Sequence, residues 1–334
     1  MMSGVLGGAM VLAIALVAVI VMRSGGSPSK PSQAAGFTST TGASSSPTAS
    51  PSAKASTSAK PKKTVKPSAS PKASKTAKAH SASTHASAPA APSVLGVPAG
   101  WKLAFDPGFS GSTLSSTWST CYDWATSASA GCTNNPSTEK EWYLPSQVQV
   151  SGGVLNLTAK QETTQGQSSS GAAQTYACRS GMVSSKPGFN FTYGLIQVTA
   201  KLPYGPGLWP ALWLAATNDQ WPPELDIMEH WYSDQDYKIY DHTVGTSYIG
   251  GPVPTPVNLS AGFHTYSLMW TKDRVTWYLD GVQKFTTTDH VPQQSMYFIA
   301  NVADRIPDGD TSTSIAPGDC TGTMQIQSVK VWQP

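Results

Sequence analysis

Acidic residues are scarce in this sequence of 334 residues, and they are unevenly placed. Charged residues make up 12% of the chain, and only five of them are glutamates. Residues 24–96 contain no aspartate or glutamate but nine lysines, among little other than Ser, Ala, Thr, Pro and Gly. Such a segment cannot bury enough apolar surface to offset the entropy lost on ordering. We therefore predict a disordered linker over residues 24–96, extended by proline and by charge repulsion.

The lysines of the linker make the net charge of the whole chain differ in sign from that of the remaining residues. The whole sequence has a formal net charge of +3, yet residues 97–334 hold 12 basic and all 19 acidic residues, which makes them about −7. A domain that binds nucleic acid would show the opposite balance. We therefore expect one folded domain over residues 97–334 with no nucleic acid as partner, and we expect it to be a monomer.

An uninterrupted apolar run occupies residues 4–22. As a helix it would extend about 28 Å, close to the thickness of a bilayer core. The basic start and A-x-A site of a cleaved signal peptide are missing, so we favour a signal-anchor over residues 1–23, with a removed signal peptide as the alternative. By the positive-inside tendency, the positive charge after the run would leave the folded domain in the cytosol. Long translocated segments follow this tendency weakly.

Cysteine is rare, and all four cysteines lie within residues 97–334, without a C-x-x-C pattern that would indicate a metal site. An even number behind an export segment predicts disulfides and an extracellular, membrane-tethered domain. Four cysteines allow three pairings. We favour Cys121 with Cys132, and Cys178 with Cys320, while four unrelated buried thiols remain the alternative.

Helical periodicity is also missing, since no stretch of residues 97–334 keeps a period of 3.6 over three turns. Apolar and polar residues alternate instead, as in strands, and Asp280-Gly281 is typical of a hairpin turn. The alternating segments are residues 148–150, 154–159, 195–202 and 324–331. We predict an all-β fold of two antiparallel sheets packed as a jelly-roll sandwich.

The densest chemistry is in residues 221–231, which read WPPELDIMEHW and hold three carboxylates between indole rings. Keeping carboxylates ionised in such an apolar context costs free energy, which indicates that they serve a function. A retaining glycosidase requires two nearby carboxyl groups, one as nucleophile and one as acid and base, with aromatic faces for the sugar. The plainer alternative is a solvated acidic loop followed by a core strand.

The spacing of these carboxylates makes a structural prediction. In a regular strand Glu224 and Asp226 share a face, whereas Glu229 points to the other. A β-bulge at Ile227-Met228 would return all three to one face. On a helix, Glu224 and Glu229 would lie about 140° apart and could not converge.

Three blocks, residues 193–203, 205–214 and 224–229, together resemble glycoside hydrolase family 16, in its laminarinase-type branch with an E-x-D-x-x-E strand. Residues 141–158, 263–281 and 324–333 extend the resemblance. It implies a concanavalin A-like jelly roll with a cleft on its concave face. By resemblance, Glu224 is the nucleophile, Asp226 orients it, and Glu229 is the acid and base.

The implied activity is retaining, endo-acting hydrolysis of β-1,3- or mixed β-1,3/1,4-glucan through a covalent glycosyl-enzyme. A transglycosylase or a galactan-specific hydrolase would use the same chemistry, and a surface carbohydrate-binding protein is a non-catalytic alternative. Related binding proteins typically lack the glutamate pair, which this chain has, so we favour catalysis.

Further residues are predicted to bind substrate. The indoles of Trp209, Trp213 and Trp231 are suited to stacking on sugars, with core packing as the alternative. Matching family positions add three polar residues: His242, Glu141 and Asn301. A lone histidine is as readily structural.

The chain also departs from the family. The frequent Y-G-R-x-E-x-R-x-K is here Tyr193-Gly-Leu-Ile-Gln-Val-Thr-Ala-Lys201, which removes two arginines and a glutamate. Gln327 stands where many members have a calcium-binding aspartate. We therefore expect no required cofactor and a structural calcium that is weak or absent.

Overall fold

The structure is a computed structural model that describes residues 94–125, 131–135, 139–231, 236–244, 247–304 and 319–334. The predicted anchor at 1–23 and residues 24–93 of the predicted linker lie outside the described residues. No helix in the described part of the chain is long and apolar enough to cross a membrane. The assignments of anchor, linker and domain boundary therefore stay predictions.

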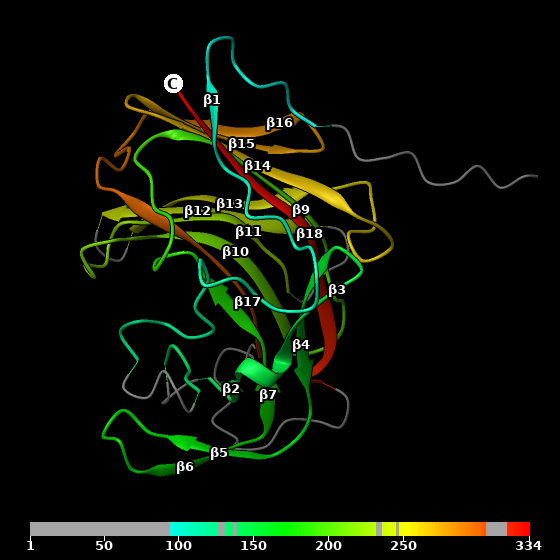
Figure 1. Ribbon diagram of the computed structural model, residues 1–334. Coiled ribbons are helices and arrows are strands. Elements are labelled where there is room, and N and C mark those ends of the chain that lie inside the picture. Colours follow the sequence, from blue (N-terminus) through cyan, green and yellow to red (C-terminus); the bar gives the residue numbers. More distant parts are fainter. Residues whose placement is uncertain (1–93, 126–130, 136–138, 232–235, 245–246, 305–318) are drawn as a thin grey trace, which may run out of the picture. The chain divides into compact units, whose positions relative to one another are not determined.

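Strands dominate the part of the chain that the structure describes (Figure 1), where the one helical element is the short 3-10 turn η1 (Pro145–Gln147). The predicted all-β class is confirmed. The strands form two large sheets and a separate hairpin of β5 (Thr164–Gln167) with β6 (Ala173–Tyr176).

The larger sheet has ten strands, in the order β16-β15-β14-β9-β18-β4-β7-β2, with β1 beside β18 and β3 beside β4. All pairs are antiparallel except β2 with β7. The strands are β1 (Lys102–Phe105), β2 (Glu141–Tyr143), β3 (Val148–Ser151), β4 (Val154–Lys160), β7 (Cys178–Ser180), β9 (Gly194–Lys201), β14 (His264–Thr271), β15 (Arg274–Leu279), β16 (Val282–Thr287) and β18 (Thr321–Gln333).

The second sheet is antiparallel and has six strands, in the order β13-β12-β11-β10-β17-β8. Its strands are β8 (Met182–Ser184), β10 (Leu208–Ala216), β11 (Glu224–Glu229), β12 (Asp236–Val244), β13 (Ser247–Pro254) and β17 (Met296–Asp304). Strand β11, with the three carboxylates, lies inside this sheet between β10 and β12, so its backbone is held from both sides.

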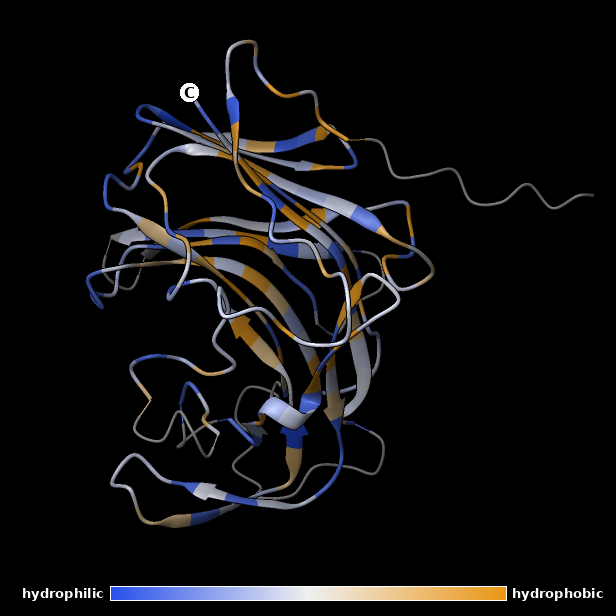
Figure 2. Ribbon diagram, in the orientation of Figure 1, coloured by the Kyte–Doolittle hydropathy of each residue, from blue (hydrophilic) through white to orange (hydrophobic). Residues whose placement is uncertain are grey.

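The core lies between the two sheets and follows from alternation along the strands (Figure 2). In β4, Leu155 and Leu157 are fully buried, while the alternate residues Asn156 and Thr158 face outward. Burial of each such leucine stabilises the fold by roughly 2 kcal/mol. The core tryptophan Trp277 also donates from Nε1 to the backbone oxygen of Asp226 at 2.8 Å. The packed core therefore supports the acidic strand directly.

The cysteines form two disulfides, in the pairing expected from the sequence. Cys178 in β7 is bonded to Cys320 just before β18, with their Cα atoms 6.1 Å apart and a sequence separation of 142. Cys121 is bonded to Cys132, with a Cα separation of 5.8 Å and a sequence separation of 11. The first ties β7 to the start of the last strand, and the second closes a short loop.

Candidate active site

Strand β11 contains the predicted bulge. Against β10, Met228 pairs with Leu212 while Asp226 pairs with Trp213, which leaves Ile227 as the extra residue. The register against β12 shifts in the same interval. Ile227 and Met228 both pack in the core. Glu229 consequently returns to the face of Glu224 and Asp226, as the spacing predicted.

The surroundings of Glu229 favour its protonated form. Its side chain is almost fully buried, and this burial raises the pKa well above the usual value. The negative charges of Asp226 and Glu224 raise the pKa further. The indole of Trp209 opposes them weakly, since its Nε1 donates to Oε1 of Glu229 at 2.8 Å. A carboxyl group with a raised pKa is suited to general-acid catalysis.

Glu224 is the carboxylate better suited to ionisation. Burial raises the pKa of Glu224 above its usual value, and His242, a hydrogen bond from Trp221 and a hydrogen bond from Asp226 oppose this rise. The Trp221 indole donates from Nε1 to Oε2 at 3.1 Å. For Asp226, burial and then the charge of Glu224 raise the pKa well above its usual range. The two acids therefore titrate together, and Glu224 has more neighbouring groups that favour its ionised form than Asp226 has.

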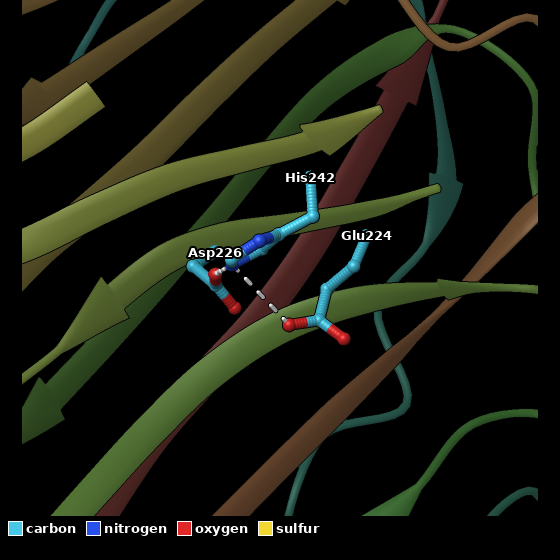
Figure 3. Close-up of side chains that lie close together, drawn as sticks. All are labelled: Glu224, Asp226 and His242. Carbon is cyan, nitrogen blue, oxygen red and sulfur yellow. Dashed lines mark ion pairs between the residues drawn. The ribbon is translucent and has the colours of Figure 1, made fainter. Parts of the chain in front are cut away.

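His242 on β12 reaches over both of these acids (Figure 3). Its Nε2 lies 3.0 Å from Oδ2 of Asp226 and 3.8 Å from Oε1 of Glu224. Among the described residues, these three side chains are the group that could hold a metal ion, since they offer ligand atoms within 4.8 Å of one another. The same contacts suit an imidazole that fixes the orientation of Asp226, and the expectation that no metal is required stays a prediction.

Aromatic rings flank the carboxylates at both ends of the strand. At the Glu229 end, the rings of Trp209 and Trp231 meet edge to face at 5.3 Å, and Nζ of Lys238 lies 4.8 Å from the Trp231 ring. At the Glu224 end, Trp124 and Trp221 line a pocket of about 350 Å³ with Glu224 itself. Rings beside an acid pair are what a bound sugar requires.

Comparison with known proteins decides the family. Residues 137–319 match the model described as "Glycosyl hydrolases family 16". The chain belongs to this family. The family predicted from the acidic motif is thereby confirmed.

Individual relatives agree with this assignment. Endo-1,3-1,4-beta-glycanase EglC of Rhizobium meliloti is 32% identical over 206 residues, which are 57% of this chain and 42% of that protein. The laminarinase catalytic domain from Thermotoga petrophila has a TM-score of 0.57 and 26% identity over 70% of this chain and 98% of that one. SCLam, a non-specific endo-beta-1,3(4)-glucanase, has a TM-score of 0.59 and 26% identity over 72% of this chain and 93% of that one. The chain spans about half the length of the curated relatives that it matches.

Within this family-16 site, two of the predicted binding residues form one unit with a tyrosine. Trp213 donates from Nε1 to Oδ1 of Asn301 at 2.8 Å, and Asn301 donates from Nδ2 to the hydroxyl of Tyr143 at 3.0 Å. Trp213 lines the pocket beside Glu224, whereas Asn301 is buried behind it. Asn301 therefore orients the Trp213 indole.

Glu141 does not lie at the surface of the family-16 site. Its side chain is 0% exposed, and its Oε2 accepts from the backbone N–H of Asp304 at 3.0 Å. The prediction that Glu141 contacts substrate is corrected here, because full burial leaves no surface for a sugar. Glu141 instead fixes the end of β17.

Several rings near the acids were not predicted as binding residues. Trp124 and Trp221 are exposed at the pocket, and Tyr240 and Tyr248 form a cluster around His242. Tyr240 could have been found, because β11 and β12 pair and Tyr240 lies opposite Asp226. Trp124 has no such local signal, since it is brought to the site by the loop that the Cys121–Cys132 disulfide closes.

Proposed function

We propose that this chain hydrolyses β-1,3- or mixed β-1,3/1,4-glucan internally, with retention of the anomeric configuration. The observation that carries the proposal is the bulge at Ile227, which brings Glu224, Asp226 and Glu229 to one face of β11. The printed activities of the relatives, endo-1,3-1,4-beta-glycanase and laminarinase, support β-glucan as substrate.

The reaction follows from how protons are distributed. Glu224 attacks the anomeric carbon while Glu229 gives its proton to the departing glycosidic oxygen, and a covalent glycosyl-enzyme forms. Glu229, now ionised, takes a proton from water, and that water attacks the same carbon from the opposite side to Glu224. Two inversions give net retention. Asp226 keeps Glu224 oriented throughout, and His242 holds Asp226.

Product analysis tests this proposal. On laminarin and lichenan we expect a mixture of short oligosaccharides early in the reaction, because internal cleavage divides chains at many points, and we expect none from agarose. Proton NMR of the first product should show the β-anomer before mutarotation. Agarose cleavage would indicate a galactan-specific hydrolase, longer products than substrate would indicate a transglycosylase, and an α-anomer appearing first would contradict the shared face of the two glutamates.

We also propose that the domain acts outside the cell, as a monomer tethered to the membrane by residues 4–22. The apolar length of this run supports the tether, and two disulfides support an oxidising compartment. As a flexible coil, the linker of some seventy residues would hold the domain roughly 50 Å from the membrane on average. This reach suits a polymeric substrate.

Cell fractionation checks the tether. Activity should sediment with membranes, and a protease added outside intact cells should release it by cutting within residues 24–96. Free protein whose N-terminus lies beyond Met22 would instead support a cleaved signal peptide. Reduced cysteines in cytosolic material would reject export.

A further inference from the structure

A second hollow lies on the outer face of the ten-stranded sheet, on the side turned away from the core. It has a volume of about 650 Å³, and residues of β3, β4 and β18 are among those lining it. These three strands are neighbours in the sheet (Figure 1). Its lining includes the side chains of Gln149, Asn156, Thr158, Lys201, Tyr204 and Gln325. None of the three acidic residues of β11 is among those lining it.

Hydrogen bonds hold the polar side chains of this outer pocket in place. Gln325 donates from Nε2 to Oδ1 of Asn156 at 3.2 Å, and Asn156 donates from Nδ2 to Oγ of Ser151 at 3.2 Å. The hydroxyls of Thr158 and Thr323 lie 3.0 Å apart. Gln325 keeps one Nε2 hydrogen and its Oε1 for a ligand, whereas Asn156, whose Nδ2 donates to Gln149, Ser151 and Val154, keeps acceptor capacity only. The pocket is therefore preorganised and able both to donate and to accept.

The charge of the outer pocket indicates the class of ligand. Lys201 is the one charged side chain among the lining residues, and the others are mainly amides and hydroxyls. Neutral groups that both donate and accept match the hydroxyls of an uncharged sugar. Tyr204 adds an aromatic ring at the edge, with a side chain 51% exposed, which is suited to stacking on a sugar face.

Tyr204 also links the outer pocket to the active site. Its ring lies 5.9 Å from the ring of His230, edge to face, and His230 directly follows Glu229 in the chain. Glu229 is the acid that protonates the leaving group in the proposed mechanism. Tyr204, at the edge of the outer pocket, therefore contacts the residue that directly follows Glu229.

We propose that the outer pocket binds a further segment of the same neutral β-glucan that occupies the active site, and so holds the enzyme on polymeric substrate. This inference rests on the proposed function. It adds a second binding surface, carried by Tyr204, Gln325 and Asn156, to the cleft of the family.

The test compares hydrolysis of two substrates by the full chain and its variants. The measured quantity is the rate on insoluble β-1,3-glucan divided by the rate on soluble β-1,3-glucohexaose, together with retention of the protein on the insoluble glucan. Tyr204→Ala and Gln325→Ala should each lower the ratio and the retention by roughly tenfold, as for a central contact of an interface. Tyr204→Phe keeps the ring and should retain wild-type values.

Gln327→Ala is the matched control, because Gln327 is an exposed amide on the same strand but does not line the outer pocket. It should leave ratio and retention unchanged. Wild-type ratio and retention in both Tyr204→Ala and Gln325→Ala, with full activity on the hexaose, would overturn the proposal that the outer pocket binds glucan and leave the proposed function standing. If salt abolishes retention on the insoluble glucan equally in the wild type and both variants, the retention is due to the lysine-rich residues 24–96. This result would also overturn the inference. No activity of the wild type on either substrate would overturn the proposed function.

Discussion

Replacing Glu224 by alanine is expected to reduce hydrolysis of β-glucan by more than about 10⁴-fold, because no neighbouring side chain can take over covalent attack. Trp221 and Asp226, the groups that now bond to Glu224, cannot act as nucleophiles toward the anomeric carbon. Azide should restore turnover of an activated substrate and yield the α-glycosyl azide, since Glu229 still assists departure. The measurement is the initial rate with and without azide, with NMR of the product.

Glu229→Ala is expected to behave differently. The loss should be about 10²- to 10⁴-fold on glucan, the usual contribution of a general acid and base, and small on a substrate with a good leaving group. Azide should then give the β-glycosyl azide. In the wild type, activity should fall as pH rises through the raised pKa of Glu229, because the acid loses its proton. This fall in activity at high pH should be absent in Glu229→Ala.

Glu162→Ala provides the control for both substitutions. Glu162 lies on the surface, paired with Lys160 and Arg179, and should leave activity unchanged. Thermal unfolding should show that all three variants are folded. Wild-type activity in Glu224→Ala or in Glu229→Ala would refute the assignment of roles.

The second large effect concerns stability. Removing the Cys178–Cys320 disulfide with a double alanine substitution should lower the free energy of unfolding by about 5 kcal/mol, because the bond closes a long loop of the unfolded chain. The Cys121–Cys132 disulfide closes a much shorter loop, so its removal by the same substitution should lower the free energy of unfolding by about 3 kcal/mol. Denaturant unfolding of the folded proteins measures both.

The two disulfides should also differ in their effect on activity. Cys121–Cys132 closes the loop that places Trp124 in the pocket beside Glu224, so its removal should raise KM for glucan. Removal of Cys178–Cys320 should leave KM unchanged under conditions where the protein remains folded. Equal losses of stability for the two pairs would contradict the dependence on loop length, and would point to strain or residual structure in the unfolded chain.

Local rules of side-chain direction explain why the acidic strand could be predicted. Alternation sends Glu229 to the wrong face, and one extra residue corrects it, so the bulge followed from the positions of three acids. The core residues Leu155 and Leu157 followed from the same rule. These predictions need only neighbours within a strand.

Predictions failed where a contact joins elements far apart in the sequence. Glu141 carries the same chemistry as the catalytic acids, and only its position beneath Asp304, 163 residues later, shows that it is buried. Trp124 likewise reaches the pocket through a loop whose path no local pattern fixes. Trp213 and Asn301 were both selected, but the sequence could not show that one orients the other.

The bulge at Ile227 has an evolutionary consequence. Ile227 and Met228 both face the core, so loss of the codon for Ile227 would leave a strand of plain alternation in which Asp226 and Glu229 still share a face. The two glutamates would keep their spacing along the strand, because they already pair with Ala215 and Ala211, which are four residues apart on β10. A lineage carrying this strand can therefore change the length of its catalytic motif by one residue and keep every acid on the side of the substrate.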